Sequence, residues 1–303
     1  MRRPGRSRYT GRTRTGAGVR LRPMPELPEV ETVRRMIAGV VVGARVASAR
    51  AIRRAYVIGS ATPRALLADG VIESVRRHGK QLAIVADDGR SLGVHLGMTG
   101  GLRVLAPGEP TPGHTHVEWD VETDSGHRRV VMADARRFGG VWTFASFEEL
   151  RRRRWATLGP DALSIPDDEF ADRLGRTRRA VKAALLDQRL LAGVGNIYAD
   201  ESLHAAGVHP GHPSARLSRA RARRLGRAIR WTLDRAIAAG GSTVRDYRDP
   251  TGVEGAFAAA HAVYGRAGAP CLRCGRRLRS GVISGRTTVW CGSCQRGPDS
   301  RRA

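Results

Sequence analysis

The stretch CLRCGRRLRSGVISGRTTVWCGSC, residues 271–294, contains all four cysteines of this 303-residue chain. They are Cys271, Cys274, Cys291 and Cys294, in the pattern C-x2-C-x16-C-x2-C. Each close pair favours a tight turn that points two sulfurs at one place, and a hairpin across the gap brings the two pairs together. Four thiolates in a tetrahedron bind Zn2+ and leave no position open for a substrate. The stretch therefore predicts a zinc finger with one structural Zn2+, and we expect no catalytic metal.

A pair of disulfides is the alternative for these cysteines. It fits less well, because no secretory signal is recognisable and the rest of the chain has no cysteine. The residues between the two pairs are basic, and Gly285-Arg286-Thr287-Thr288 suits a compact hairpin tip. Such a tip can place the Arg286 guanidinium on a phosphate. Zinc ribbons occur in many nucleic-acid-binding proteins, so this motif alone does not name the function.

Upstream of the finger, apolar residues recur at helical spacing. They predict helices at 168–174, 179–190, 196–206 and 216–239, the last one ended by Gly240-Gly241. The turn 191–196 carries two glycines and Asn196, a good N-cap, and a helix start with bare amides is a ready phosphate site. A plain connection between two helices explains this turn equally well. We expect residues 146–160 to form a linker and residues 243–262 a mobile loop.

From about residue 40 to 145 the hydrophobic period shifts towards two, which indicates strands. Residues 75–85 and 91–104 flank Asp87-Asp88-Gly89, and residues 116–123 and 127–133 flank Asp124-Ser125-Gly126, two hairpin signals. Repeated short strands of this kind predict a β-sandwich or a barrel. Before them, residues 28–38 have the pattern of an amphipathic helix. Glu29 and Glu31 then suit the positive start of that helix.

The chain is strongly basic, with 53 Lys+Arg against 28 Asp+Glu and a formal net charge of +25. A compact protein with this much positive charge favours a polyanionic partner such as DNA. A GC-rich genome that inflates arginine is the competing explanation. The apolar share of 41% excludes a disordered basic tail, and the length suggests about two domains. No apolar run approaches the ~18 residues that a membrane span needs, so we expect no membrane association.

Lys80 and Lys182 are the only lysines among these 53 cations. Where composition drives lysine to arginine, a remaining lysine points to a place where arginine does not serve. Lysine differs by its compact ammonium group and by its ability to give up a proton. Both positions are therefore candidate functional sites, with chance survival as the alternative.

Six motifs follow one another between about residue 24 and residue 296. They are Met24-Pro25-Glu26-Leu27-Pro28-Glu29-Val30-Glu31-Thr32, His95-Leu96-Gly97-Met98, Asp134-Ala135-Arg136-Arg137-Phe138-Gly139, Val194-Gly195-Asn196-Ile197-Tyr198-Ala199, Val263-Tyr264-Gly265-Arg266 and the zinc finger. In this order they resemble the motifs of one family, the bacterial formamidopyrimidine-DNA glycosylases, which remove oxidised purines from DNA. The sister group, endonuclease VIII, favours oxidised pyrimidines, and its N-terminal string usually lacks the leucine found here at position 27.

The resemblance implies an α+β multi-domain fold: a β-sandwich with an N-terminal helix, a helix–two-turn–helix domain and a β-hairpin zinc finger. The corresponding boundaries are 24–150, 151–262 and 263–296, with a disordered extension at 1–23 and a tail at 297–303. The resemblance also implies a monomer that binds double-stranded DNA containing oxidised purines or abasic sites. We expect it in the bacterial cytoplasm, associated with the nucleoid.

The resemblance further implies how the residues act. Pro25 matches the N-terminal proline that attacks the sugar and forms a Schiff base, and Glu26 matches the neighbouring acid/base carboxylate. A terminal secondary amine has a pKa near ~8, so part of it is neutral and nucleophilic at pH 7. Lys80 matches a lysine assigned to proton transfer during elimination. Arg286 matches the finger arginine credited with phosphate binding and the second elimination.

Other positions match residues that contact DNA in the family. Met98, Arg136 and Phe138 match the side chains that fill the space left by an extruded nucleotide. Without the resemblance, Met98 and Phe138 would be interpreted as core residues. The remaining matches are His95, His114, Arg178, Lys182 and the phosphate-binding Asn196.

Twenty-three residues precede Met24. While they stay attached, the Pro25 nitrogen is an amide without a usable lone pair, and the mechanism fails. Three interpretations follow: translation starts at Met24, a leader is cleaved, or the extension is kept and the protein binds DNA without glycosylase activity. We expect the first, so that the mature protein starts at Pro25.

Overall fold

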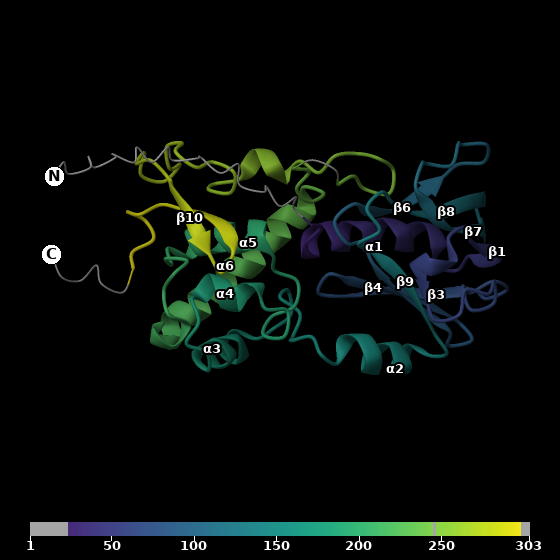
Figure 1. The fold of residues 1–303 in the computed structure, drawn as a ribbon, viewed down its shortest axis with the longest axis horizontal. Helices are drawn as coiled ribbons and strands as arrows, with labels where there is room; N and C mark the ends of the chain where they lie inside the picture. The colour runs from purple at the N-terminus through teal and green to yellow at the C-terminus, as the bar shows by residue number, and fades with distance from the viewer. Residues whose placement is uncertain (1–23, 245–246, 298–303) are drawn as a thin grey trace, which may run out of the picture.

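The computed structural model describes residues 24–244 and 247–297. The predicted disorder of residues 1–23 and most of the predicted tail lie outside this part of the chain. The described residues form an elongated molecule in which a β-rich half lies beside a half made of helices and a β-hairpin (Figure 1). Helix α1 (Leu27–Val41) starts where the two halves meet and runs into the β-rich half.

The β-rich half is a sandwich of two sheets, as predicted. Among the described residues, the strands of this half pair antiparallel, except for the short parallel pair of β2 and β9. Apolar side chains from both sheets and from α1 form one continuous core. The four-stranded sheet has the order β1 (Arg45–Ala51), β7 (Thr115–Thr123), β8 (Gly126–Asp134), β6 (Gly100–Leu105), and the five-stranded sheet β2 (Val57–Ile58), β9 (Gly140–Phe144), β5 (Ser91–His95), β4 (Gln81–Ala86), β3 (Ile72–His78).

Both predicted hairpin turns are confirmed, between β4 and β5 and between β7 and β8. Two further turns escaped the sequence pattern, because residues 75–85 and 91–104 are each divided in two. The first break is at Gly79, at a φ of +57°, and the second is at Gly97, at +66°. Both glycines adopt a left-handed backbone conformation, which glycine tolerates better than residues with a Cβ do. The breaks matter because they place Lys80 and Met98 in turns at the edge of the sandwich.

The helical half contains α3 (Asp167–Gly175), α4 (Val181–Leu186), α5 (Asn196–Ala206) and α6 (Arg219–Ala238). Short 3-10 turns lie at Ser214–Arg216 and Phe257–Ala260, and another lies in the sandwich at Arg54–Tyr56. The helix expected over 179–190 is shorter, because the Asp187 side chain accepts a hydrogen bond from the Arg189 amide and closes a turn. The linker expected at 146–160 is partly helical, with α2 (Phe147–Leu150) and a π-helical turn (Arg151–Trp155). The Ser146 hydroxyl caps α2 by accepting from the Glu149 amide at 3.1 Å.

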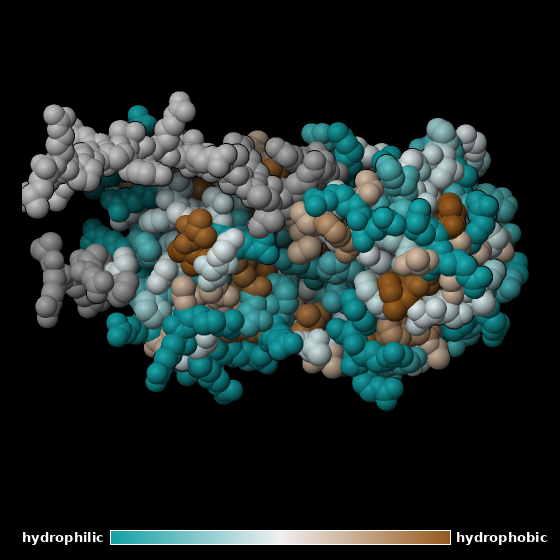
Figure 2. Space-filling view, in the orientation of Figure 1, coloured by the Kyte–Doolittle hydropathy of each residue, from teal (hydrophilic) through white to brown (hydrophobic). Residues whose placement is uncertain are grey.

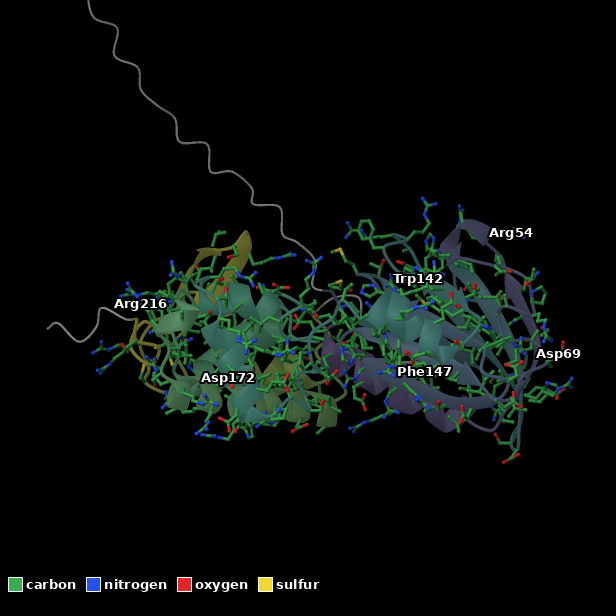
Figure 3. The ribbon with its side chains drawn as sticks, turned by 90° about the horizontal axis from the view of Figure 1, so that it is seen from below. Arg54, Asp69, Trp142, Phe147, Asp172 and Arg216 are labelled. Carbon is green, nitrogen blue, oxygen red and sulfur yellow. The ribbon has the colours of Figure 1, made fainter. Side chains whose placement is uncertain are left out.

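Helix α1 belongs to both cores. Its first residue, Leu27, is fully buried among the helices, whereas Val30, Val33 and Ile37 pack into the sandwich. Arg77 of β3 strengthens the same junction, because its guanidinium binds Glu31 of α1 and Asp161 of the helical half. Glu31 is thus a buried partner of arginines rather than only an acid at a helix start. Figure 3 shows the two halves from below, with Trp142 and Phe147 on one and Asp172 and Arg216 on the other.

The C-terminal hairpin consists of β10 (Arg279–Ile283) and β11 (Arg286–Trp290). Hydrophilic side chains cover most of the face seen in Figure 2, and apolar side chains appear there in small separate patches. Within the described residues, no helix is both long enough and apolar enough to cross a membrane.

Candidate active site at the junction of the two halves

The start of α1 is held in place by the helical half and by a side chain of α1 itself. The Leu27 amide donates to the Gly193 carbonyl at 3.1 Å, and the Glu26 amide donates to the Glu29 carboxylate at 2.8 Å. A Cβ on Gly193 would lie 2.4 Å from Leu27 Cδ1, so this close packing requires glycine. Pro25, directly before these contacts, is buried. The junction therefore fixes the backbone on which the predicted nucleophile lies.

The Glu26 carboxylate binds the N-terminus of α5. It accepts hydrogen bonds from the amides of Gly195 at 2.7 Å, Ile197 at 2.9 Å and Tyr198 at 3.4 Å. These are the amides expected to lie bare and ready for a phosphate, so that prediction needs correction: the protein's own carboxylate occupies them. Asn196 is not the N-cap either, because Gly195 holds that position.

Lys80 approaches Glu26 across Gly195. A Cβ on Gly195 would lie 2.5 Å from Glu26 Oε1 and 2.6 Å from Lys80 Nζ, so only glycine lets the two charged groups face each other here. The β3–β4 turn that carries Lys80 is itself held in place, because the Gly79 amide donates a hydrogen bond to the Asp161 carboxylate at 2.8 Å. The structure thus brings Pro25 and Glu26, at the start of α1, together with Lys80, from the turn between β3 and β4, beside the start of α5.

Burial and charge shift the ionisation of this cluster. Burial raises the pKa of Glu26, against the opposing effects of the Lys80 charge and the three amides. Burial also lowers the pKa of Lys80; the two nearby glutamates oppose this shift and the Arg286 charge adds to it. Both groups are therefore moved towards their neutral forms, which suits groups that exchange protons near neutral pH.

Glu29 is a member of this cluster that the sequence pattern missed. It was expected to be an acid at the helix start, but it is buried and accepts from Tyr198 Oη at 2.5 Å and from the Ser242 amide at 2.7 Å. Burial and then the Glu26 charge raise its pKa to about 7. Glu29 lies one helical turn after Glu26 and contacts Tyr198 of α5, a helix far away in the sequence. No sequence pattern indicates this contact.

Arg286 extends this cluster from the zinc-finger hairpin. It is exposed at the start of β11, and its charge acts on both Lys80 and Lys182. The next residue, Thr287, is held by Asn196, whose Nδ2 donates to the Thr287 carbonyl at 3.1 Å. Asn196 therefore lies beside the hairpin that carries Arg286, and its contact with a phosphate stays a prediction.

Lys182 differs from the prediction of a DNA contact. Its side chain is completely buried, and Nζ lies 2.7 Å from Asp200 Oδ1. Nζ also donates to the Thr288 hydroxyl at 2.8 Å and to the Thr287 carbonyl at 3.1 Å. These three acceptors inside the protein satisfy the Lys182 ammonium group. Lys182 therefore joins the helical half to the zinc-finger hairpin and does not face solvent.

His95 lies at the end of β5, paired with Gln81, the residue after Lys80. Its Nδ1 accepts from the Gly97 amide at 3.1 Å. Burial, and then the charges of Arg154 and Lys80, lower the pKa of His95 to about 4. The imidazole is therefore neutral at pH 7 and can donate a single hydrogen bond through Nε2.

The three residues predicted to fill a vacated base position lie on two adjoining turns. Phe138 is 54% exposed, so it is not a core residue, and the Arg136 guanidinium lies over its ring at 4.5 Å. Met98 is half-buried on the neighbouring turn, and His114 is exposed just before β7. Arg178 is exposed just before α4, in the helical half. The exposure of an aromatic ring under a guanidinium suits contact with a nucleic acid.

The four cysteines form a metal-binding cluster. Their sulfurs all lie within 4.8 Å of one another, with Cys274 to Cys291 at 3.5 Å and Cys271 to Cys294 at 4.0 Å. Zn–S bonds of about 2.3 Å in a tetrahedron correspond to sulfur–sulfur distances of about 3.8 Å. The donor set and its spacing therefore fit a structural Zn2+, as predicted. The residues of the hairpin between the two pairs lie directly beside Asn196 and Lys182.

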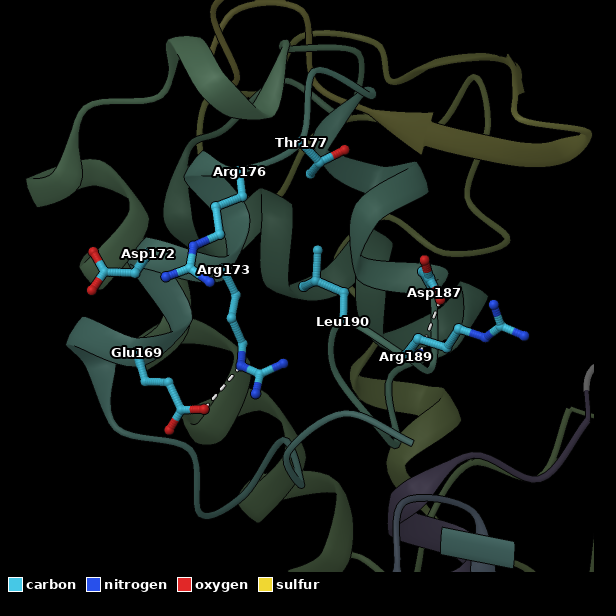
Figure 4. Close-up of a pocket in the computed structure, with 8 residues that line it drawn as sticks. All are labelled: Glu169, Asp172, Arg173, Arg176, Thr177, Asp187, Arg189 and Leu190. Carbon is cyan, nitrogen blue, oxygen red and sulfur yellow. Dashed lines mark hydrogen bonds and ion pairs between the residues drawn. The ribbon is translucent and has the colours of Figure 1, made fainter. Parts of the chain in front are cut away.

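A surface hollow of about 690 Å³ lies between α3 and the turn after α4 (Figure 4). Its charged side chains are balanced, and Arg173 donates to Glu169 at 2.9 Å. The hollow contains none of the predicted catalytic residues. The convergent buried charges at the junction are therefore better evidence for an active site than this hollow.

Three family models match the chain. They are described as the formamidopyrimidine-DNA glycosylase N-terminal domain at residues 24–141, the formamidopyrimidine-DNA glycosylase H2TH domain at 158–248, and a zinc finger found in FPG and IleRS at 268–297. A formamidopyrimidine-DNA glycosylase of Xanthomonas oryzae pv. oryzae is 43% identical over 279 residues, which are 90% of this chain and all of that protein.

Solved structures agree with the family models. The MutM (FPG) protein from Thermus thermophilus is 41% identical, with a TM-score of 0.78 over 89% of this chain and 98% of that one. A variant of Lactococcus lactis FPG in complex with a Fapy-dG containing DNA is 31% identical, with a TM-score of 0.81 over 90% of this chain and all of that one.

Proposed function

We propose the function of this chain from one premise: it belongs to the formamidopyrimidine-DNA glycosylase family. It is a DNA glycosylase of base-excision repair that removes oxidised purines and nicks the strand at the resulting abasic site. Its substrate is lesion-containing double-stranded DNA, in keeping with a net charge that stays strongly positive without the eight arginines of residues 1–23. We expect it to act as a monomer on the nucleoid of a bacterial cell.

The observation that carries the mechanism is the convergence of Glu26 and Lys80 beside Pro25. When Pro25 is the N-terminal residue, its secondary amine attacks the anomeric carbon of the extruded nucleotide, and the bond to the damaged base breaks. Glu26, fixed on the amides of α5, is the group that exchanges protons with the sugar. The product is a Schiff base between Pro25 and the opened sugar.

Lys80 and Arg286 act on the phosphates. The iminium withdraws electrons, so a proton next to it can be removed and the 3′ phosphate leaves by β-elimination; the 5′ phosphate leaves in a second elimination. Lys80, whose pKa is lowered mainly by burial, gives up its proton more readily than an ordinary lysine and can take part in the proton transfers of these steps. Arg286 lies exposed on the hairpin tip, where its guanidinium can bind the departing phosphate. Zn2+ holds the hairpin and takes no part in these steps.

Two forms of the protein test this proposal. One starts at Pro25 after removal of Met24, and the other keeps residues 1–23. With borohydride and a duplex containing 8-oxoguanine or a formamidopyrimidine, the first form should be trapped on DNA as a covalent adduct and the second should not. The matched control is the first form on the same duplex without a lesion.

Failure of the Pro25 form to excise either lesion would contradict the proposal. So would a covalent adduct that peptide mapping places on a residue other than Pro25. Excision by the form that keeps residues 1–23, in a preparation shown by N-terminal sequencing to be intact, would also remove the proline from the mechanism.

A further inference from the structure

The turn after β5 and the loop after β8 are packed together so tightly that they form one unit. A Cβ on Gly97 would lie 2.4 Å from the Gly139 nitrogen and 2.5 Å from the Phe138 carbonyl carbon. A Cβ on Gly139 would lie 2.4 Å from the His95 carbonyl oxygen. The backbones are therefore in direct contact. Movement of the turn that carries Met98 must also move the loop that carries Phe138.

One buried carboxylate ties both segments together. Asp134, the last residue of β8, has no exposed surface. Its Oδ1 accepts from Thr99 Oγ1 at 2.6 Å and from the Arg136 amide at 3.2 Å, and its Oδ2 accepts from the Gly139 amide at 2.8 Å. Thr99 belongs to the first segment and the two amides to the second. Tyr56 Oη completes the set, donating to Oδ2 at 3.1 Å.

The backbone of Asp134 reaches a third segment. Its amide donates to the His114 carbonyl at 3.0 Å, and its carbonyl accepts from His116 Nε2 at 2.8 Å when that nitrogen carries the proton. Burial raises the pKa of Asp134, but the hydrogen bonds, first those of Thr99 and Gly139, outweigh it and hold this pKa below its ordinary value. Asp134 is therefore ionised at neutral pH, and a carboxylate forms stronger hydrogen bonds than a neutral group.

We propose that Asp134 is a positioning residue for base extrusion, which holds Met98, Arg136 and Phe138 as one rigid wedge through its hydrogen bonds to Thr99, Arg136 and Gly139. This inference rests on the proposed function, in which these three side chains fill the position left by the extruded nucleotide. A wedge fixed before it enters DNA loses little conformational freedom on binding, so the binding energy is used to open the base stack. Asp134 does not touch DNA; it acts through the wedge.

The test compares Asp134→Asn with Tyr56→Phe. Asparagine has nearly the same volume but only one acceptor oxygen, so two of the four donors lose their partner. We expect single-turnover excision of 8-oxoguanine from duplex DNA to fall about 10- to 100-fold, as misplacement of a positioned group does. Nicking at a preformed abasic site, which needs no base extrusion, should fall less than about 3-fold. Tyr56→Phe removes a donor that belongs to neither segment of the wedge, and it should change excision less than about 3-fold.

A double-mutant cycle with Phe138→Ala separates positioning from general damage. If Asp134 acts through the wedge, adding Asp134→Asn to Phe138→Ala should reduce excision by less than about 3-fold further. Thr99→Val, which removes the hydroxyl donor at constant shape, provides a second variant should Asp134→Asn fail to fold. It should reduce excision more than nicking, and unfolding temperature and zinc content confirm that each variant is folded.

The outcomes are distinguishable. If the unmodified Pro25 form does not excise 8-oxoguanine, the proposed function fails. If that form excises but Asp134→Asn and Thr99→Val excise equally well, the positioning role is overturned while the function stands. The role is overturned too if excision and nicking fall together, or if the effect of Asp134→Asn is undiminished in the Phe138→Ala background.

Discussion

Lys80 and Lys182 each lie beside a buried carboxylate, yet their surroundings differ. Lys182 has three acceptors within 3.1 Å, from Asp200, Thr287 and Thr288, and no exposed surface. Among the described residues, Lys80 Nζ forms no hydrogen bond; it faces Glu26 across Gly195. A lysine whose three protons are all used inside the protein is a structural cation. A lysine with unused donors beside a carboxylate remains available to a substrate.

The two sites also differ in what builds them. The Lys80 site is made by the start of α1, the turn between β3 and β4, and the start of α5. The Lys182 site closes only when β11 of the zinc finger lies on α4 and α5, since Thr287, Thr288 and Val289 all bind there. The first is thus part of the junction between the halves, and the second is the attachment of the finger.

Removal of zinc should disrupt the Lys182 site and leave the Lys80 site intact. We expect this change to have the largest effect on stability. A structural Zn2+ stabilises its domain by about 10 kcal/mol or more, so chelation should release β11 from α5. In hydrogen exchange, the Val289 amide, which donates to Asp200, should lose its protection. The amides of Ile197 and Tyr198, bound to Glu26, should keep theirs. Equal loss at both places would show that the two sites are not independent.

Substitution of Lys80 should affect activity far more than stability. Lys80→Met removes the group that we propose to exchange protons, and the loss of such a group typically lowers a rate by about 10² to 10⁴. We expect this decrease in nicking at abasic sites, with an unfolding temperature within a few degrees of the unmodified protein. The control is Arg224→Met, an exposed cation on α6. Normal nicking by Lys80→Met would show that Lys80 takes no part in the mechanism.

Substitution of Lys182 should have the opposite profile. Lys182→Met leaves Asp200 buried without its cation, which typically costs about 3–5 kcal/mol of folding stability. Urea unfolding should show this loss, and the double variant Lys182→Met/Asp200→Asn should recover part of it. Measured well below its unfolding midpoint, Lys182→Met should keep much more nicking activity than Lys80→Met. Full stability with lost activity would restore the DNA contact first predicted for Lys182.

The difference between the lysines also marks what the sequence could predict. The sandwich, the helices, the finger and the residues around Pro25 follow from periodicity, cysteine spacing and the family motifs. The burial of Lys182 does not, because a cation in the first turn of a short helix is expected on the surface. The binding of Glu26 to the start of α5 does not follow from these patterns either, because Glu26 and Gly195 are 169 positions apart in the sequence. Asp134 lies within a family motif, but its proposed role depends on turns that the strand pattern hides.

Glu29 gives the smallest effect and the finest distinction, because the Lys80 site holds two buried glutamates. The pKa of Glu29 is raised from 4.5 to about 7, mainly by burial and then by Glu26. Between these values the folded state keeps a proton that the unfolded state has released. Stability is therefore present below pH 4.5 and is lost as the pH rises through about 7. We expect a decrease of about 1–3 kcal/mol, measured by urea unfolding from pH 4.5 to 8.

Glu29→Gln should flatten this decrease, because glutamine does not titrate, even though the variant loses an acceptor for the Glu26 amide. The matched control is Glu31→Gln. Arg34, Arg35 and Arg77 overcome the effect of burial and lower the pKa of Glu31 to about 2, so its titration ends below the range measured. That variant should be less stable at every pH but keep the slope. If Glu29→Gln keeps the slope as well, the proton is held elsewhere in the cluster, with Glu26 as the nearest carboxylate.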